Sequence, residues 1–359
     1  MQALREEIYK ALEQVIDPEL RRPVTELDMV RDIAIEGGDV TITIALTVAG
    51  CPLRASFEDQ VQRWVAPLEG VGTVRLAFDV MSPDEKTALT EKLRGGVSER
   101  TKGIALDKST RVLAIASGKG GVGKSSLTAN LAAAFSSLGH RTGVLDADIY
   151  GHSIPHMLGI RQRPVVVDKM IVPPVREDLK LMSIGFFLED NSPIMWRGPM
   201  LHRALEQFLS DVHWGELDTL VVDMPPGTGD VAISLGQLLP RAEAVLVTTP
   251  QPAAQEVAIR AGTMARKTNM RLLGVVENMS GDVFGIGGAD RLAEELGVPV
   301  FGSIPLDSRI RECADAGEPI VWEEPDSPAS QTIMRIAQAI DGTKRELGVG
   351  IVKELPVLS

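Results

Sequence analysis

The sequence is poor in cysteine, with only Cys51 and Cys313 among its 359 residues. Two thiols cannot form the disulfide framework of a small secreted protein, so a reducing, cytoplasmic environment is expected. The first ten residues carry acidic side chains and lack the apolar core of a signal peptide. No apolar run approaches the length of a membrane span, and we expect no membrane partner.

Aromatic residues and clustered positive charge are also scarce. Aromatics make up 4% of the chain, so aliphatic side chains must supply most of the core. The formal net charge is -12, and no basic run is long enough to form a nucleic-acid footprint. We therefore expect no nucleic-acid partner. The length of the chain favours two domains over one.

The chain does contain a glycine-rich stretch at residues 118–125, with the sequence GKGGVGKS. It fits the phosphate-loop pattern G-x-x-x-x-G-K-[ST]. An apolar, β-prone run precedes it at 112–116, and residues 126–138 follow with apolar side chains at helical spacing. The loop is thus expected between a strand and a helix N-terminus, where free N–H groups and the helix dipole attract an anion. The alternative is a glycine-rich turn that ends in Lys-Ser by chance.

Each residue type in this stretch has a chemical reason. The glycines allow backbone angles that a Cβ would oppose, so several N–H groups can converge on phosphate oxygens. Lys124 supplies a positive charge to the β- and γ-phosphates, and Ser125 offers a hydroxyl to Mg²⁺. The residues predicted to bind the nucleotide here are Gly118, Lys119, Gly120, Gly121, Val122, Gly123, Lys124 and Ser125.

Residues 1–81 are expected to form a small α+β domain. Hydrophobic spacing predicts helices at 4–15 and 53–65 and strands at 29–35, 40–48 and 72–80. Gly37 and Gly38 indicate a hairpin between the first two strands. Residues 82–108 are polar and charged, which predicts a linker that is part helical around 85–93.

Residues 109–359 are expected to form a second, larger domain in which strands and helices alternate. Strands are predicted at 112–116, 142–146, 179–184, 219–223, 244–249, 272–277 and 300–304, with a hairpin at 165–175. This alternation indicates an α/β fold with a mostly parallel sheet covered by helices on both faces. Together with the phosphate loop at 118–125, it predicts a P-loop NTPase. The last helix, at 330–347, has a weakly basic polar face, which favours a packed helix over a membrane-surface helix.

Ligands of parallel sheets bind at the carboxyl ends of the strands, so polar residues that follow strands are candidate site residues. Asp223 follows one strand and is expected to accept from Mg²⁺-bound water. Gly227 is expected to present its N–H to the γ-phosphate, and Asp148 to orient or deprotonate the attacking water. Asp146 competes with Asp148 for this role, and a helix N-cap or turn position is the alternative for each aspartate.

Cys51 lies at an expected turn beside a helix N-terminus, where a thiolate is stabilised. It is a candidate ligand of a metal or cluster, or a reactive thiol. The alternative is a small, buried apolar residue. One thiol cannot hold a cluster, so a ligand role requires a partner chain or a second molecule.

Lys119 is a second lysine early in the loop, which a generic phosphate loop does not need. With it, residues 118–125 resemble the deviant phosphate loop of the nitrogenase iron protein and MinD superfamily. In that superfamily the extra lysine reaches the nucleotide of the partner subunit. The resemblance therefore implies an ATP-bound homodimer, with Lys119 and Lys124 both acting in Mg-dependent ATP hydrolysis.

Further segments narrow the resemblance to the Mrp/ApbC family of iron–sulfur ATPases. They are 146–151 (DADIYG), 196–200 (WRGPM), 223–230 (DMPPGTGD) and 277–280 (ENMS), together with Asp17-Pro18-Glu19 and 47–52 (TVAGCP) in the smaller domain. The resemblance implies an ATPase that carries or scaffolds iron–sulfur clusters, with assembly factors and apoprotein clients as partners. It also implies that Asn278 and the segment Pro305-Leu306-Asp307 contact adenine.

The chain departs from the family at residues 281–288, GDVFGIGG, where many members have a Cys-x-x-Cys pair. Four thiolates from two subunits would be needed for a bridging cluster. Cys313 falls in an expected helix and is interpreted as structural, which makes Cys51 the better candidate ligand. Two other functions remain open: a positioning switch ATPase like MinD or ParA, and an ATP-gated adaptor without a cluster.

Overall fold

A computed structural model describes residues 2–48, 54–93, 106–107, 109–149, 151–187, 198–227, 229–239 and 241–343. The chain divides into two compact units. The first combines Met1–Lys108 with Ile160–Met182 and Glu206–Leu217, and the second comprises Ser109–Gly159, Ser183–Leu205 and Asp218–Ser359. The first unit thus takes two segments from beyond residue 108, which the sequence did not indicate.

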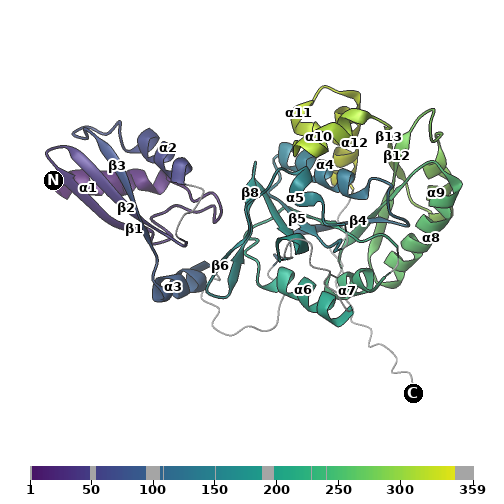
Figure 1. Cartoon of the computed structure of the whole chain (residues 1–359), viewed down its shortest axis with the longest axis horizontal. Coiled ribbons are helices and arrows are strands. Elements are labelled where there is room, and N and C mark those ends of the chain that lie inside the picture. Colours follow the sequence, from purple (N-terminus) through teal and green to yellow (C-terminus); the bar gives the residue numbers. More distant parts are fainter. Residues whose placement is uncertain are drawn as a thin grey trace, which may run out of the picture. The chain divides into compact units, whose positions relative to one another are not determined.

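The first unit contains a three-stranded sheet in the order β1-β2-β3 (Figure 1). Its elements are α1 (Gln2–Ala11), a 3₁₀ turn (Leu12–Gln14), β1 (Val30–Glu36), β2 (Asp39–Leu46), α2 (Arg54–Trp64), β3 (Val74–Val80) and α3 (Pro83–Leu93). β1 and β2 are antiparallel and form the expected hairpin, because Gly37 and Gly38 take φ values of 58° and 97° that favour glycine. β2 and β3 are parallel.

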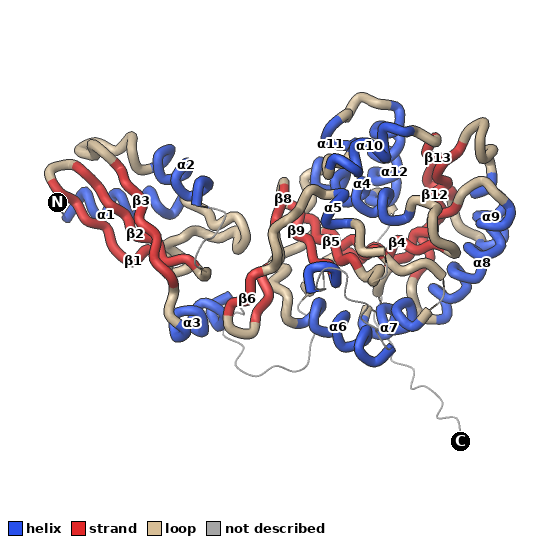
Figure 2. Tube along the Cα trace, viewed as in Figure 1, coloured by secondary structure: helices blue, strands red, loops and turns tan. Residues whose placement is uncertain are grey.

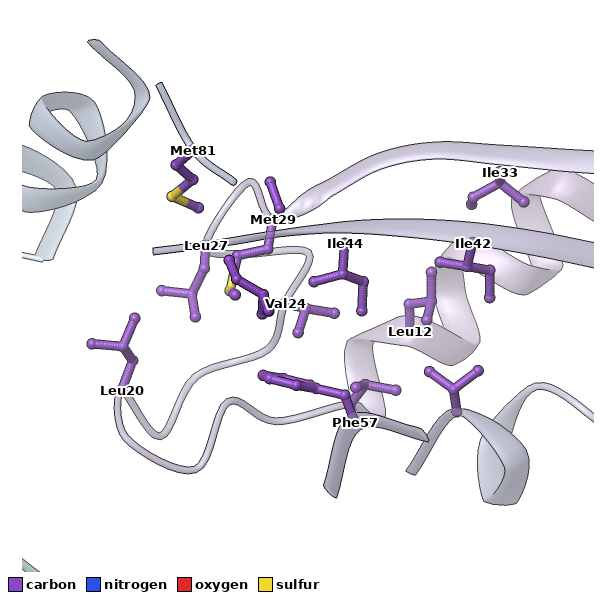
Figure 3. Close-up of a cluster of buried hydrophobic side chains, with 14 of the residues drawn as sticks. Leu12, Leu20, Val24, Leu27, Met29, Ile33, Ile42, Ile44, Phe57 and Met81 are labelled. Carbon is purple, nitrogen blue, oxygen red and sulfur yellow. The ribbon is translucent and has the colours of Figure 1, made fainter. Parts of the chain in front are cut away.

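The core of the first unit is aliphatic, as the scarcity of aromatics predicts. Figure 3 shows side chains of β1, β2, the first helical segment and the loop before β1 gathered in one cluster with Phe57 of α2. The predicted second hairpin forms from β6 (Val165–Val167) and β7 (Met170–Val172) and adds Val167, Met170 and Val172 to the same core. β8 (Val175–Arg176) and β9 (Leu179–Ser183) follow this hairpin in the sequence and pair antiparallel.

The larger sheet has the strand order β13-β12-β11-β4-β10-β5-β9-β8, so β9 lies next to β5. Its strands from β13 to β5 are parallel. Their bounds are β4 (Arg111–Ser117), β5 (Thr142–Asp146), β10 (Thr219–Asp223), β11 (Glu243–Thr248), β12 (Arg271–Ser280) and β13 (Val300–Pro305). Each predicted strand of this sheet is confirmed within a few residues. The four central strands, β11, β4, β10 and β5, are almost fully buried, as expected for a sheet covered on both faces. The edge strand β13 is mostly half-buried.

Helices cover both faces of this sheet (Figures 1 and 2). α4 (Lys124–Ser137), α10 (Ser308–Ala316), α11 (Ile320–Glu323) and α12 (Pro328–Asp341) lie on one face, and α7 (Asp230–Leu238), α8 (Pro252–Lys267) and α9 (Gly288–Leu296) on the other. The remaining helical segments are α5 (Ile154–Met157), a 3₁₀ turn (Ile184–Phe187) and α6 (Gly198–Ser210). α12 buries Ile333, Ile336 and Ile340, so it is a packed helix. Of the helices described, none is both long enough and apolar enough to cross a membrane.

A buried ion pair fixes the end of α12 to the sheet. Arg111, at the start of β4, donates from Nε to Oε2 of Glu243 at 2.6 Å and from Nη1 to the carbonyl oxygen of Ile340 at 2.7 Å. Arg271 donates to the other oxygen of Glu243 at 3.2 Å. Arg111 therefore neutralises a buried carboxylate and adds a bond to the Ile340 carbonyl at the helix C-terminus, which also accepts the N–H of Thr343 at 3.1 Å.

Candidate functional site

The phosphate loop lies between the end of β4 at Ser117 and the start of α4 at Lys124, as predicted. Two of its glycines are required by close approaches. A Cβ at Gly118 would lie 2.3 Å from the carbonyl carbon of Val257 in α8. Gly123 has a φ of 82°, and a Cβ there would lie 2.1 Å from Nδ2 of Asn278. The loop is thus held between α8 and the end of β12.

Lys124 lies at the centre of a buried cluster of charged side chains. Its side chain is 6% exposed, and Nζ lies 2.7 Å from Oδ2 of Asp223 and 3.3 Å from Oδ2 of Asp148. The hydroxyl of Ser125 donates to the same Oδ2 of Asp223 at 2.7 Å. The structure therefore brings together Lys124, Ser125, Asp148 and Asp223, which the sequence predicts as site residues from three separate segments.

Asp223 is completely buried at the end of β10. Burial raises the pKa of its carboxyl group, while the charge of Lys124 and hydrogen bonds from Ser125 and Thr128 oppose that rise. The hydroxyl of Thr128 lies 2.8 Å from Oδ1 of Asp223 and 2.9 Å from the carbonyl oxygen of Lys124. Sequence reasoning missed Thr128, although its position one helical turn after Lys124 places both on one face of α4.

Asp146 and Asp148 both follow β5 but have different surroundings. Asp148 pairs with Lys124, whereas Asp146 is completely buried and accepts from Ser183 Oγ at 2.9 Å and from the N–H of Asp148 at 3.2 Å. Burial, followed by the charge of Asp223, raises the pKa of Asp146 to about 8. Asp148, not Asp146, is therefore the aspartate that faces the phosphate-loop lysine.

The oxygen atoms of this cluster suit Mg²⁺. Ser125 supplies a hydroxyl and Asp223 a carboxylate, both hard ligands of the type that Mg²⁺ prefers, only 2.7 Å apart. The ammonium group of Lys124 lies on the same carboxylate oxygen, so the protein already places a cation at this oxygen. The donor set fits a magnesium ion that also binds phosphate oxygens.

Other residues of the predicted site have more open surroundings. Lys119 is half-buried, and its ammonium group has no partner among the residues that the structure describes, while Gly120 and Gly121 are exposed. Gly227 donates its N–H to the carbonyl oxygen of Ser117 at 2.8 Å, so it must leave that bond to reach a phosphate. Val122 is buried beneath the loop.

The residues predicted to contact adenine lie at the ends of β12 and β13. Asn278 is buried, and its Nδ2 donates to the carbonyl oxygen of Val122 at 2.9 Å. Asp307 caps α10 by accepting from the N–H of Arg309 at 2.8 Å, and Pro305 ends β13. Contact with adenine stays a prediction for all three residues. The structure assigns Asn278 a first role, which is to support the phosphate loop from below.

Glu277, near the end of β12, is a buried residue that the sequence analysis did not identify as part of the site. One carboxylate oxygen accepts from Ser303 Oγ at 2.7 Å and from the N–H of Gly287 at 3.2 Å, and the other accepts from the N–H of Ala289 at 3.0 Å. These bonds satisfy donors at the start of α9 and hold Gly287 and Ala289 against Glu277 of β12.

Cys313 is not part of a ligand cluster in the part of the chain that is described. Cys51 lies outside the described residues, as do Tyr150, Trp196, Arg197 and Thr228 of the family motifs. Cys313 is 3% exposed in α10, and burial raises the pKa of its thiol, as expected for a structural cysteine. Within the described ranges no three His, Cys, Asp or Glu side chains are grouped to hold a metal ion.

Comparisons with known proteins agree with this geometry. A family model described as "NUBPL iron-transfer P-loop NTPase" matches residues 108–341, and one described as "Iron-sulfur cluster assembly protein" matches residues 5–76. An "iron-sulfur cluster carrier protein" of Mycobacterium leprae is 50% identical, covering 96% of this chain and 94% of its own length. One from Bacillus subtilis is 41% identical, covering 94% of this chain and 97% of its own length.

Solved structures give the same fold. A nucleotide-binding protein from Archaeoglobus fulgidus, solved in complex with ADP, is 37% identical with a TM-score of 0.54, covering 63% of this chain and 92% of that chain. The septum site-determining protein MinD from Pyrococcus horikoshii, solved with Mg-ADP, is similar in fold alone, at 24% identity and a TM-score of 0.52, covering 65% of this chain and 96% of that chain. With these matches and its phosphate loop, the chain belongs to the iron-transfer family of P-loop NTPases and carries an iron–sulfur cluster assembly domain before it.

Proposed function

We propose that this protein binds and hydrolyses Mg-ATP at the phosphate loop and uses that cycle to carry or scaffold iron–sulfur clusters for apoproteins. The observation that carries the proposal is the buried cluster of Lys124, Ser125, Asp148 and Asp223 at the carboxyl edge of the sheet. In this division of labour, residues 1–81 supply the assembly domain, residues 82–108 the connection and residues 109–359 the ATPase domain, except that the segments 160–182 and 206–217 belong to the first compact unit.

Nucleotide binding changes the partners of Lys124. In the structure its ammonium group compensates two carboxylates, Asp223 and Asp148. Phosphate oxygens also offer the ammonium group charge-assisted hydrogen bonds, and the N–H groups of the loop and of α4 add further donors for the phosphates. Mg²⁺, when bound by Ser125 and Asp223, supplies positive charge that offsets the charge developing on the phosphates.

Hydrolysis requires a water molecule in line with the γ-phosphate. Asp148 is 7% exposed and faces the loop, so its carboxylate is placed to orient that water or accept its proton. Phosphate release measured with Mg²⁺ and with EDTA tests this reaction. We expect release only with Mg²⁺, and a loss of at least tenfold in kcat for Asp148→Asn. Mg-independent release, or full activity of the variant, would refute the mechanism.

The proposed active form is a homodimer. Lys119 is half-buried without a partner among the described residues, which leaves its ammonium group free for a nucleotide bound to a second copy. The resemblance to the deviant phosphate loops supports this role in trans. Light scattering with and without ATP tests the dimer: a chain that stays monomeric with bound ATP would remove it.

The iron–sulfur cargo would be bound through thiolates, and Cys51 is the candidate ligand. A cytoplasmic protein with one such thiol per chain needs further ligands from an assembly factor or a client apoprotein. Anaerobic reconstitution with iron and sulfide tests the role, with Cys313→Ala as the matched control because Cys313 is buried in α10. We expect iron and sulfide in the wild type and the control, and their loss in Cys51→Ala. Equal content in all three would exclude Cys51.

An ATP-gated adaptor without a cluster is the second candidate. Two observations favour it: residues 281–288 lack cysteine, and no metal-binding group of side chains occurs within the described ranges. The reconstitution separates the two functions, because an adaptor would take up no iron or sulfide and would still bind ATP. A membrane-bound positioning switch is disfavoured, since the apolar face of α12 is packed against the protein.

A further inference from the structure

We infer that Ser183 is a positioning residue that holds the loop bearing Asp148, acting through Asp146. Ser183 is the last residue of β9, and it is completely buried. Its hydroxyl donates to Oδ2 of Asp146 at 2.9 Å. This inference rests on the proposed ATP hydrolysis and adds a residue to it.

The hydrogen bonds form a chain that ends at the backbone of Asp148. Oδ1 of Asp146 accepts the N–H of Asp148 at 3.2 Å, while Oδ2 accepts from Ser183. The hydroxyl oxygen of Ser183 in turn accepts the N–H of Gly185 at 3.1 Å. The Ser183 hydroxyl thus donates its proton to Asp146 and accepts the Gly185 N–H with one lone pair. Because each oxygen of the Asp146 carboxyl group has its own donor, the group is held in one orientation.

The side chain of Asp148 has few other restraints. Its Oδ2 lies 3.3 Å from Lys124 Nζ, and its Oδ1 accepts the N–H of Gly151 at 3.2 Å. When Lys124 binds phosphate oxygens, its contact with Asp148 weakens. The backbone bond to Asp146 does not depend on the lysine, so it can keep Asp148 in place during the reaction.

Loss of the Ser183 hydroxyl would leave a buried oxygen of Asp146 and the half-buried N–H of Gly185 without this partner. Unpaired buried groups relax toward new partners, and here such a shift moves the Asp148 loop. Small displacements of a catalytic group reduce the chemical step far more than they reduce substrate binding. Ser183 should therefore affect kcat and leave the KM for ATP nearly unchanged.

The test compares Ser183→Ala with Ser183→Thr, which keeps the hydroxyl, and with Ser330→Ala. Ser330 is also completely buried and donates from Oγ to the carbonyl oxygen of Ile320 at 2.9 Å, in contacts separate from the Asp148 loop. We expect Ser183→Ala to lower kcat about tenfold with KM within about threefold. Ser183→Thr should recover most of kcat. Ser330→Ala should lower the Tm and keep kcat.

A double-mutant cycle makes the inference independent of folding losses. If Ser183 acts through Asp148, adding Ser183→Ala to Asp148→Asn should lower the residual kcat no further. Equal kcat in wild type and Ser183→Ala, or fully additive losses in the double mutant, would overturn the inference. If the wild type itself releases no phosphate, the proposed hydrolysis fails instead, so the two failures can be told apart.

Discussion

The substitution Lys124→Met separates the structural and the nucleotide-binding roles of the phosphate-loop lysine. It removes the charge and keeps a side chain of similar length. In the structure, the ammonium group of Lys124 lies 2.7 Å from the buried Asp223 carboxylate and 3.3 Å from that of Asp148. The variant leaves both carboxylates without this compensation, so the fold should lose stability even when no nucleotide is present.

The expected loss of stability in Lys124→Met follows from the burial of the ion pair. Removing one partner of a buried pair costs about 3–5 kcal/mol, and each kcal/mol lowers Tm by about 2–4 °C in a unit of this size. The Tm should therefore fall by roughly 6–20 °C, in the lower part of that range because Asp223, whose pKa is already raised, can take up a proton. ATP loses a charge-assisted hydrogen bond of about 1.5–3 kcal/mol, which weakens binding about 10- to 150-fold.

Thermal unfolding without nucleotide and equilibrium titration with Mg-ATP measure the two effects. The double variant Lys124→Met/Asp223→Asn is the matched control. The neutral amide no longer needs a cation, so it should regain much of the lost Tm without regaining ATP binding. The reasoning is refuted if Lys124→Met melts like the wild type, or if it binds ATP with unchanged affinity.

Three further changes have defined outcomes. Lys119→Met should keep its nucleotide-free Tm and its ATP affinity but lose phosphate release, and normal turnover would exclude a role in trans. Arg111→Met should lower the free energy of unfolding in urea by about 3–5 kcal/mol, because Glu243 loses a buried partner, and a loss below about 1 kcal/mol would contradict this. Burial raises the pKa of Glu19 from 4.5 to about 7, so the folded chain binds this proton more tightly than the unfolded chain. The fold is therefore most stable, with respect to this group, below about pH 4.5 and loses that stability as the pH rises to about 7. Glu19→Gln should thus raise the Tm at about pH 8 and change it little at about pH 4; the same shift at both values would show that ionisation is not the cause.

The sequence predicted the parts of the site that depend on local spacing and on strand ends. The phosphate loop is one continuous segment, and its glycines and Lys124 have fixed places within it. Asp148 and Asp223 could be added because the carboxyl ends of parallel strands meet at one edge of a sheet. Thr128 was within reach of the same reasoning, since helical spacing alone places it beside Lys124.

Other features depend on partners that only the strand order brings together. Arg111 reaches Glu243 because β4 lies next to β11, and the two residues are 132 positions apart in the sequence. Ser183 and Asp146 meet in the same way over 37 positions. The sequence around Arg111 or Ser183 does not indicate these contacts, because an arginine at the start of a strand and a buried serine at the end of one are common in any sheet.

Titration calorimetry of the full chain with Mg-ATP tests the nucleotide site. The proposed hydrolysis, the proposed dimer and the proposed role of Ser183 all depend on this site. We expect saturable heat with one site per chain for the wild type, and strongly weakened binding for Lys124→Met. Absence of heat from a folded wild-type protein, confirmed by its cooperative thermal unfolding, would contradict the proposed function at its first step.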